Sequence, residues 1–398
     1  MERALVLGAG IMGLSAAWAL DAAGHRVTVV EQDGVPNPRG ASVDDHRLIR
    51  HAYGDAAGYM RMVDEAYDAW DLLFEAIGER PYAETGVLAL AGGPMARAGW
   101  FDASRRSLRG HGLAVQDLAV DELEGRFPWL RAGSVAEAFL MPRGGVLLAR
   151  RIVDALARHL RARGVAFRHG CATGIDPARA RLGLSDGTVA EADRLVVAAG
   201  PWAPRLLPEL AGRVTPSRQV VVYLDPPPAH REAWARAPMV LDLSEEGGFY
   251  AVPPVAGTGL KIGDHRFSCR GDAEDPRAVT AAERDALLDL ALPRLRDGGA
   301  YRVTEARACY YDVAEGERFV VEPLSDRCVV MSGFSGHGFK FGPALGRAVA
   351  AAMGDPACMA ALPAWAAGNA ARRRDAAGNA AGNEDAAGIA ARNEDAVA

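Results

Sequence analysis

Lysine is nearly absent from this chain of 398 residues. The sequence holds 45 lysine and arginine residues together, of which only Lys261 and Lys340 are lysine, so 43 are arginine. A guanidinium is wide and planar, whereas an ammonium is compact and carries three rotatable donors. A lysine kept against so strong a preference for arginine is therefore a candidate for a functional role.

Cysteine is scarce, and long apolar runs are missing. The five cysteines are widely spread without a CxxC spacing, which argues against a disulfide framework or a metal site and predicts a reducing, cytoplasmic setting. No apolar run reaches the roughly 18 residues of a membrane-spanning helix. The apolar N-terminus lacks the basic leader and cleavage site of a signal peptide. A net charge of -6 gives no broad basic surface for nucleic acid. Neither a membrane nor a nucleic-acid partner is expected.

The first thirty residues follow a βαβ dinucleotide-binding pattern. Residues 3–7 and 26–30 are short apolar strand patterns, with a glycine motif and an alanine-rich helical stretch between them. Gly8 makes the turn, Gly10 lets the backbone approach a pyrophosphate, and Gly13 allows close helix packing, while the glutamate after the second strand accepts ribose hydroxyls. The spacing leaves FAD and NAD open, although a single fingerprint at the N-terminus favours FAD. The candidate cofactor-binding residues are Gly8, Gly10, Ile11, Met12, Gly13 and Glu31.

The remaining pattern predicts a mixed α/β fold in which a Rossmann-like domain carries an inserted antiparallel sheet. Apolar residues recur at helical spacing over 59–77, and 144–164 reads as a loop entering an amphipathic helix. A buried strand runs to Gly200 and Trp202, a second place where backbone approaches the cofactor. Strands alternate with turns over 216–312, apart from one helix near 280–295.

These boundaries predict a discontinuous nucleotide domain. It comprises residues 1–80, 145–215 and 320–362, and the substrate domain comprises 81–144 and 216–319. Residues 363–398 contain a ten-residue repeat with almost no bulky apolar side chains, so they are expected to be a disordered tail.

Five segments together resemble monomeric sarcosine oxidase and N-methyltryptophan oxidase, within the glycine/D-amino acid oxidase flavoprotein superfamily. They occur in the family's order from residue 4 to about 350, and the resemblance implies FAD rather than NAD. The segments are GAGIMGLSAAWAL (8–20) with Glu31, RLIRHAYG (47–54), GLKIGDH (259–265), ACYY (308–311) and GFSGHGFKF (333–341).

The resemblance implies that the flavin is covalently attached. Cys309 matches the family cysteine whose sulfur is bonded to the 8α-methyl carbon of the flavin. That reaction needs a thiolate, so nearby positive groups should lower the thiol pKa. The alternative for Cys309 is a small buried core residue. This is the interpretation given to Cys171, Cys269, Cys328 and Cys358.

The resemblance also assigns roles to four cations. Lys261 matches the lysine over the flavin ring where oxygen is reduced; a unit charge about 4 Å away is worth on the order of 4 kcal/mol at an effective dielectric constant near 20. Arg47 should lie on the opposite face and favour anionic reduced flavin. Arg50 and Lys340 match the pair that holds the substrate carboxylate.

Further pocket residues follow from the same resemblance. Tyr250, His265 and Tyr311 match residues that line the amine, although a structural role for His265 stays open. The glycine-rich loop should approach the flavin ring through Gly333, Gly336, His337, Gly338 and Lys340. One departure is that Ser42 and Val43 replace adjacent family histidines, which leaves the identity of the amine open.

The predicted function is FAD-dependent oxidation of a secondary or cyclic amino acid to an imine by hydride transfer, with O2 reduced to H2O2 by a monomeric enzyme. One alternative is a biosynthetic oxidase or dehydrogenase of the same fold, acting on a cyclic imine or using another electron acceptor. The other is a flavin-binding module without turnover.

Overall fold

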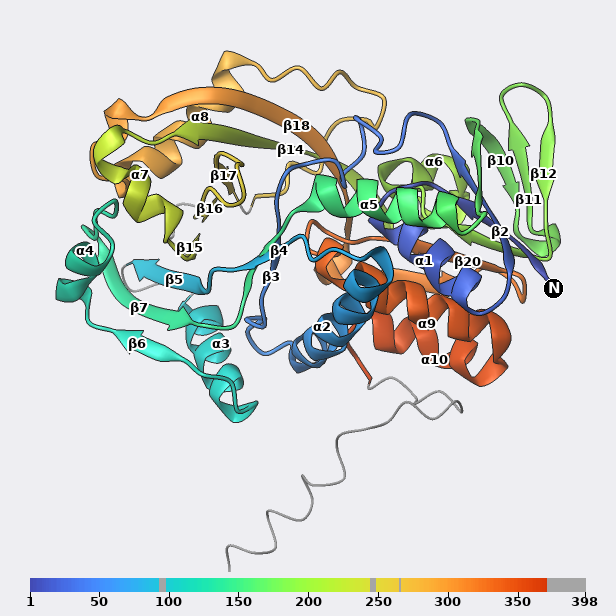
Figure 1. Ribbon diagram of the computed structural model, residues 1–398, viewed down its shortest axis with the longest axis horizontal. Coiled ribbons are helices and arrows are strands. Elements are labelled where there is room, and N and C mark those ends of the chain that lie inside the picture. Colours follow the sequence, from blue (N-terminus) through green and yellow to red (C-terminus); the bar gives the residue numbers. More distant parts are fainter. Residues whose placement is uncertain (93–97, 244–247, 265, 371–398) are drawn as a thin grey trace, which may run out of the picture.

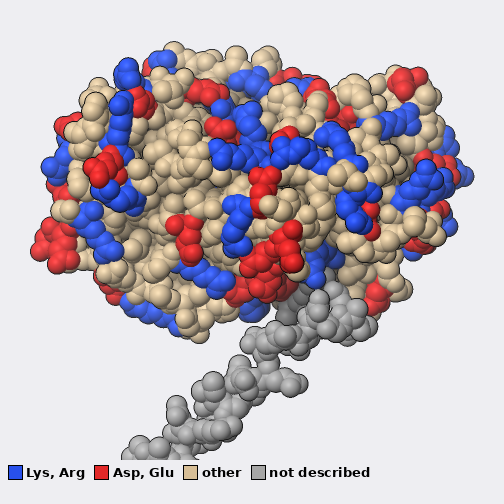
Figure 2. All heavy atoms as spheres, viewed as in Figure 1, with Lys and Arg blue, Asp and Glu red and all other residues tan. Residues whose placement is uncertain are grey.

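The computed structural model describes residues 1–92, 98–243, 248–264 and 266–370. Two sheets organise the chain, one at each side of the view in Figure 1. Acidic and basic side chains are interspersed over the face drawn in Figure 2. No helix in the described ranges is both long and apolar enough to cross a membrane, and these ranges hold no cluster of three metal-ligating side chains.

The first sheet has six strands and carries the dinucleotide pattern. Five strands are parallel, and only β19 at the edge is antiparallel. Alternate side chains of β1 enter two different cores: Ala4 and Val6 face helices, whereas Leu5 and Leu7 face a small antiparallel sheet. Burial on both faces explains why the strands are continuous apolar runs. The strand order is β19 (Val320–Pro323), β20 (Cys328–Ser332), β13 (Arg194–Val197), β1 (Arg3–Leu7), β2 (Arg26–Glu31) and β9 (Ala166–His169).

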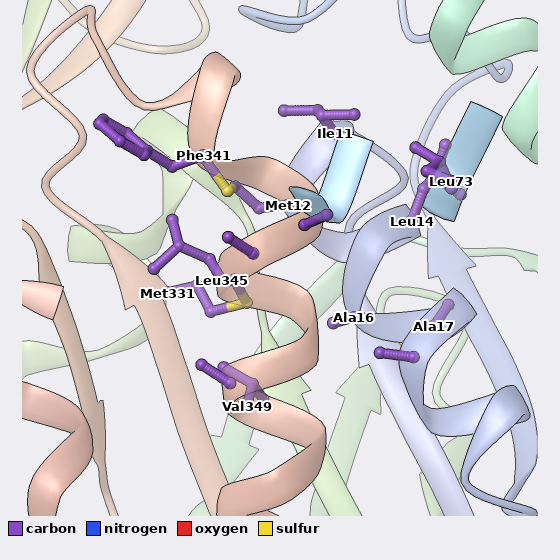
Figure 3. Close-up of a cluster of buried hydrophobic side chains, with 14 of the residues drawn as sticks. Ile11, Met12, Leu14, Ala16, Ala17, Leu73, Met331, Phe341, Leu345 and Val349 are labelled. Atoms are coloured by element: carbon purple, nitrogen blue, oxygen red, sulfur yellow. The ribbon is translucent and has the colours of Figure 1, made fainter. Parts of the chain in front are cut away.

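Helices α1 and α9 pack closely against each other under the first sheet. Leu14 of α1 and Leu345 and Val349 of α9 are fully buried in the cluster drawn in Figure 3. The helix backbones approach so closely at Gly346 that a Cβ there would lie 2.4 Å from the carbonyl of Ser15. The helices of this domain are α1 (Ile11–Ala22), α2 (Ala57–Ile77), α5 (Ala149–Ala162), α6 (Ala203–Leu206), α9 (Gly342–Gly354) and α10 (Pro356–Ala366).

The second sheet has eight strands, and all its pairings are antiparallel except that of β15 with β5. The long strands β14 and β18 arch from this sheet toward the first (Figure 1). The strand order is β18 (Arg302–Ala314), β14 (Val214–Asp225), β17 (Leu260–Asp264), β16 (Phe249–Val252), β15 (Met239–Asp242), β5 (Val87–Gly92), β7 (Val135–Met141) and β6 (Gln116–Leu118). Its helices are α3 (Ala98–Gly110), α4 (Leu123–Arg126), α7 (Pro228–Ala235) and α8 (Ala281–Ala291).

Two small sheets complete the fold. One consists of β10 (Ala172–Asp176), β11 (Arg181–Leu184) and β12 (Val189–Glu191), and the other of β3 (Arg47–Ile49), β8 (Gly145–Leu147) and β4 (Tyr82–Glu84). Together with the two large sheets they confirm the predicted mixed α/β fold.

Two local predictions need correction. Residues 145–147 form strand β8 rather than a loop, because they pair with both β3 and β4. The tail was predicted to begin at residue 363, yet α10 continues to Ala366 and Trp365 is buried. The rest of the predicted disordered segment, from residue 371, lies outside the described residues.

The α1–α9 contact predicts a large difference between two glycines of the same helix. Gly346→Ala should lower the free energy of unfolding by about 1–3 kcal/mol, because the added methyl group meets immovable backbone. Gly354→Ala is the matched control, since nothing lies within 4 Å of the added group. Thermal and denaturant unfolding measure both. Equal stability of the two variants would contradict this account of the helix contact.

Candidate functional site

A cavity of about 420 Å³ lies at the carboxyl ends of the parallel strands, and we call it the nucleotide cavity. It is where a doubly wound sheet binds its ligand. The predicted cofactor residues that line it are Gly8, Gly10, Ile11, Met12, Glu31, Arg47, Gly200, Trp202, Gly336 and Gly338.

Close backbone contacts explain the glycine motif. Gly8 has φ of 103°, and a Cβ there would lie 2.3 Å from the carbonyl oxygen of Ala198. A Cβ on Gly13 would lie 1.9 Å from the oxygen of Gly8. The loop is fixed further because the amide of Ile11 donates to Oγ of Ser42 over 3.0 Å. Side chains are therefore kept out of the cradle at the start of α1.

Glu31 already has several partners within the protein. Its carboxylate accepts hydrogen bonds from the amide of Ala9 (2.7 Å), the amide of Gln32 (2.9 Å) and Nδ2 of Asn37 (2.9 Å). Glu31 thus ties the glycine loop to the end of β2 while lining the nucleotide cavity.

A second cavity, of about 380 Å³, lies against the eight-stranded sheet, and we call it the substrate cavity. Four residues line both cavities, so the two adjoin at a common wall formed by Arg47, Tyr311, Gly336 and Phe339. The other predicted site residues in the substrate cavity are Arg50, Tyr250, Lys261, His337 and Lys340.

Lys340 and Arg50 are two cations of the substrate cavity; burial lowers the pKa of Arg50, and Glu317 in the same lining works to raise it. Lys340 is 4% exposed and donates to the Tyr53 hydroxyl (2.9 Å) and the His337 carbonyl (3.0 Å). Arg50 donates to the carbonyl of Ala52 and lies over the Tyr53 ring at 5.2 Å. Within the described part of the chain, neither forms an ion pair with a carboxylate. Burial and the nearby Arg50 hold the pKa of Lys340 well below its usual value. Such a pair is suited to an anionic ligand.

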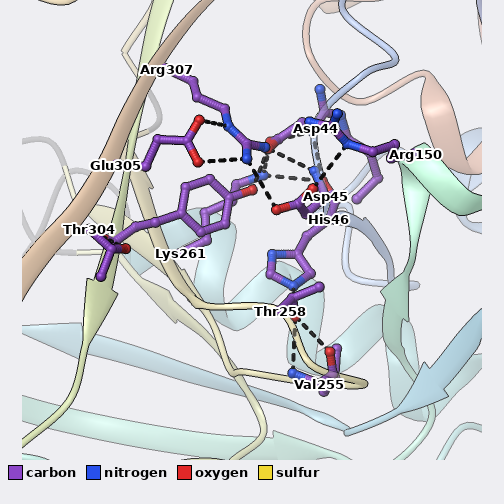
Figure 4. Close-up of polar contacts among 12 residues, drawn as sticks. Asp44, Asp45, His46, Arg150, Val255, Thr258, Lys261, Thr304, Glu305 and Arg307 are labelled. Atoms are coloured by element: carbon purple, nitrogen blue, oxygen red, sulfur yellow. Dashed lines mark hydrogen bonds and ion pairs between the residues drawn. The ribbon is translucent and has the colours of Figure 1, made fainter. Parts of the chain in front are cut away.

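Lys261 and Arg47, in contrast, share a carboxylate that was not predicted. Asp44 is 7% exposed, and its Oδ2 accepts from Nζ of Lys261 and, at 2.6 Å, from Nη1 of Arg47. Tyr223 and Arg307 approach Oδ1, as Figure 4 shows for the labelled Arg307, and Nη1 of Arg307 lies 3.3 Å from it. Lys261 also donates to the carbonyl of His46 over 3.1 Å.

These charges shift one another's pKa values. Burial works to raise the pKa of Asp44, but Lys261 and Arg47 outweigh it and hold that pKa well below its usual value. Burial lowers the pKa of Lys261, with Asp44 opposing the shift and Arg47 adding to it. For Arg47, burial works to lower the pKa, but Asp44 together with Tyr311, Cys309 and Tyr250 outweighs it and the net pKa is raised. Asp44 is thus anionic and Arg47 cationic.

The aromatic and imidazole groups of the substrate cavity are neutral at pH 7. Burial raises the pKa of Tyr250 and of Tyr311. Burial, together with Lys261, lowers the pKa of His46 to about 3; burial and Lys340 lower that of His337 to about 3. Tyr250 lies across Gly263, where a Cβ would be 2.3 Å from its hydroxyl oxygen.

Cys309 lies on β18, two residues before Tyr311, so both side chains project from the same face of the strand. Burial raises the pKa of its thiol, although Arg47 works to lower it. Lys261 and Arg277 also work to lower it, as expected of positive groups, but burial is the larger effect and the net pKa is raised rather than lowered. The interpretation of the other cysteines as small buried core residues is wrong for two of them, since Cys171 and Cys269 are exposed. Cys171 lines the nucleotide cavity.

Several predicted cofactor contacts lie elsewhere. His337 and Lys340 line the substrate cavity and not the nucleotide cavity. Gly333 is packed against Ala314 and Val320, which explains the need for glycine there without a cofactor. His265 lies outside the described residues.

Some residues of the site were missed by sequence reasoning. Tyr53 lies within the segment 47–54 that was singled out for Arg47 and Arg50, and Asp44 lies just before it, so their proximity was the available signal. Trp100, Asp264 and Glu317 line the substrate cavity and were not predicted. Asp264 lies in the same segment, 259–265, as Lys261, whereas Trp100 and Glu317 lie outside the five segments that resemble the family.

Known proteins match nearly the whole chain. A model of the FAD dependent oxidoreductase family matches residues 3–352. Monomeric sarcosine oxidase of Bacillus sp. (strain B-0618) is 28% identical over 354 residues, covering 86% of this chain and 89% of that protein. N-methyl-L-tryptophan oxidase of Yersinia pestis (strain Pestoides F) is 28% identical over 357 residues, covering 87% and 93%.

Solved structures share the fold. Iminodiacetate oxidase from Chelativorans sp. BNC1 superposes with a TM-score of 0.74 at 22% identity, covering 89% of this chain and 96% of that one. L-proline dehydrogenase from P. horikoshii gives a TM-score of 0.74 at 20% identity, covering 88% and 92%. The resemblance inferred from the motifs is confirmed, and the chain belongs to the FAD-dependent oxidoreductase family.

Proposed function

We propose that this enzyme oxidises the C–N bond of a secondary or cyclic amino acid to an imine and reduces O2 to H2O2. The substrate loses a hydride and a proton, and these combine with O2 as peroxide. Bound FAD supplies the hydride acceptor. The nucleotide cavity fits FAD, because a Cβ on Gly10 would have only Ser42 within 4 Å and would otherwise project into open space at the start of α1, where a pyrophosphate would bind.

The unpaired cations Arg50 and Lys340 carry the proposal. Burial disfavours the charged forms of both groups in the free protein, and neither has a carboxylate in salt-bridge contact among the described residues, so a substrate carboxylate would relieve that cost. They line the cavity that adjoins the nucleotide cavity at Arg47 and Tyr311. An amino acid held there by its carboxylate would lie next to the common wall of the two cavities. Oxidation of the carbon beside the nitrogen requires this closeness to the cofactor.

The neutral groups around the cavity support an amine as the reacting group. Tyr250 and Tyr311 are phenols at neutral pH, so they can donate to or accept from a secondary amine without a net charge. We assign amine contact to both, and to His265 by its motif position. Lys261 we assign to O2 reduction, where a fixed positive charge stabilises the negative charge that develops on oxygen, and Arg47 to stabilising reduced flavin.

The names of the similar proteins favour the same substrate class. Sarcosine, N-methyltryptophan, iminodiacetate and proline are all secondary amines. Their side chains differ, so they favour the class and leave the particular amine open. The apolar members of the substrate-cavity lining favour a substrate with an apolar part; they are Leu48, Trp100, Leu241, Leu243, Phe267 and Phe339.

A second candidate is a dehydrogenase of the same fold that uses another electron acceptor or acts on a cyclic imine. The ion pair of Lys261 with Asp44 favours it, because it reduces the net positive charge offered to oxygen. Peroxide formed per turnover separates the candidates. A flavin-binding module without turnover would have no use for the Arg50–Lys340 pair.

The proposal includes a monomer in a reducing, cytoplasmic compartment. All five cysteines are free, which is consistent with reducing conditions.

Lys340→Met tests the carboxylate assignment. Loss of a charge-assisted hydrogen bond worth about 1.5–3 kcal/mol should raise the KM for an N-methyl amino acid by about 10- to 150-fold. The KM for the matching carboxamide should hardly change, because it carries no charge for Lys340 to balance. Steady-state kinetics with both compounds provide the test. An equal loss for acid and carboxamide would mean that Lys340 only shapes the cavity.

We further propose that the flavin is bonded to Cys309 through sulfur, on the motif position and the shared strand face with Tyr311. After acid precipitation the yellow colour should stay with the protein, and the Cys309 peptide should carry the flavin mass. Cys309→Ala should release the colour. Cys171→Ala is the matched control, because Cys171 lines the nucleotide cavity and its loss should not release the colour. Colour in the supernatant of the unaltered protein would overturn the covalent bond.

A further inference from the structure

A single buried carboxylate joins the two cations assigned to the flavin site. Asp44 lies in the segment before β3, and Oδ2 accepts from both Lys261 and Arg47. It reaches Lys261 across 217 residues of sequence. The contact therefore connects the polar segment after the dinucleotide unit to β17 of the eight-stranded sheet.

The second oxygen of Asp44 is held as firmly as the first. Oδ1 accepts from the hydroxyl of Tyr223, from the amide of Asp45 at 2.9 Å and from Arg307 at 3.3 Å. Tyr223 is the register partner of Lys261 on the neighbouring strand β14. The orientation of the carboxylate toward Lys261 is thus set by groups from three strands, β14, β17 and β18.

We propose that Asp44 is a positioning residue that fixes the Lys261 ammonium at the substrate cavity and keeps it charged beside Arg47. The inference rests on the proposed function only in assigning Lys261 to O2 reduction. The charge and position of Lys261 can be measured without any substrate.

The physical reason lies in the crowding of like charge. Lys261 is 2% exposed and has the Arg47 guanidinium nearby. Both burial and Arg47 favour a neutral amine, and Asp44 is the anion that opposes them. Without Asp44, the pKa of Lys261 should fall further, by about 1–3 units, which is the usual effect of an opposite charge at this range. Since an amine loses its charge as pH rises through its pKa, the ammonium would then be lost at a lower pH.

Other titratable and charged groups face Lys261 or its partner Asp44. They do not replace Asp44, because each of them is either cationic or neutral at pH 7. These groups are Arg47 and His46 from the segment around β3, Tyr223 from β14, Tyr250 from β16, and Arg307 and Cys309 from β18.

Selective labelling measures the charge of Lys261 directly. Because the chain has only two lysines, lysine labelled with 13C at Cε gives two signals in the holoprotein, and Lys261→Met identifies one. Asp44→Asn should move the titration of the Lys261 signal down by about 1–3 pH units and leave the Lys340 signal in place. An unchanged or upward-shifted titration would overturn the proposal.

Asp45→Asn is the matched control. It removes one carboxylate from the adjacent position, where Asp45 contacts Arg307 and Arg150 but not Lys261. It should leave the titration of Lys261 unchanged. A shift equal to that of Asp44→Asn would mean that removing any nearby negative charge has the same effect, and it would overturn the positioning role. Asp44→Glu should restore much of the charge. Asp44→Ser provides the same test as Asp44→Asn should the amide variant not fold.

Reoxidation gives a second readout that needs no substrate. Flavin reduced by light under nitrogen is mixed with O2, and the rate is followed against pH. In Asp44→Asn the rate should fall by about 10-fold or more over the pH range in which the Lys261 signal titrates, and it should show no such fall in the Lys261→Met background. A rate that rises, or falls equally in both backgrounds, would overturn the inference.

The role of Lys261 with O2 and the role of Asp44 toward Lys261 are tested separately. If the unaltered protein and Lys261→Met reoxidise equally, Lys261 has no role with O2, and the proposed oxidase function loses its support while the Lys261 titration still tests Asp44. If the unaltered protein and Lys261→Met reoxidise at different rates but Asp44→Asn leaves the titration of Lys261 unchanged, only the proposed role of Asp44 is wrong.

Discussion

The sharing of the Asp44 carboxylate between Lys261 and Arg47 is the interaction on which the arrangement of the site depends. Arg47 begins β3 and lies on the common wall of the two cavities, whereas Lys261 belongs to the eight-stranded sheet. Two buried cations would repel each other and resist burial if each stood alone. One anion between them holds both side chains charged, and it links the segment after the nucleotide unit to the sheet that forms the substrate cavity.

The cations of the site therefore divide into two kinds. Lys261 and Arg47 have a permanent anionic partner, so their charge belongs to the folded protein. Arg50 and Lys340 have hydroxyl, carbonyl and ring partners but no salt bridge in the described chain, so a ligand carboxylate can pair with them and stabilise their charged forms. This division separates the cations that would bind the substrate from the cations placed at the common wall of the two cavities. It also explains how a chain with a net charge of -6 concentrates positive charge where an anion and oxygen would meet.

Structural features that depend on neighbouring residues were predicted from the sequence, whereas contacts between distant segments were not. The glycine loop was predictable because it follows a local motif: Gly13 is required by its contact with Gly8, and Gly8 has a positive φ, although Gly8 also packs against the distant Ala198. The presence of both lysines in the substrate cavity was predictable because an arginine-rich composition makes them stand out. The Asp44–Lys261 pair was not, since it joins segments 217 residues apart. Strand β8 was missed because only its pairing with β3 and β4 makes it a strand, and the raised thiol pKa of Cys309 depends on burial that no motif encodes.

A crystal structure of the FAD-loaded protein with an unreactive carboxylate analogue of a secondary amino acid would test the account most directly. We predict that the carboxylate oxygens lie within hydrogen-bonding distance of Arg50 and Lys340. The carbon chain should extend toward the wall formed with Arg47 and Tyr311, with Lys261 still paired to Asp44. A carboxylate bound to Lys261 or Arg47 instead, with Arg50 and Lys340 left without it, would contradict the proposed mode of substrate binding.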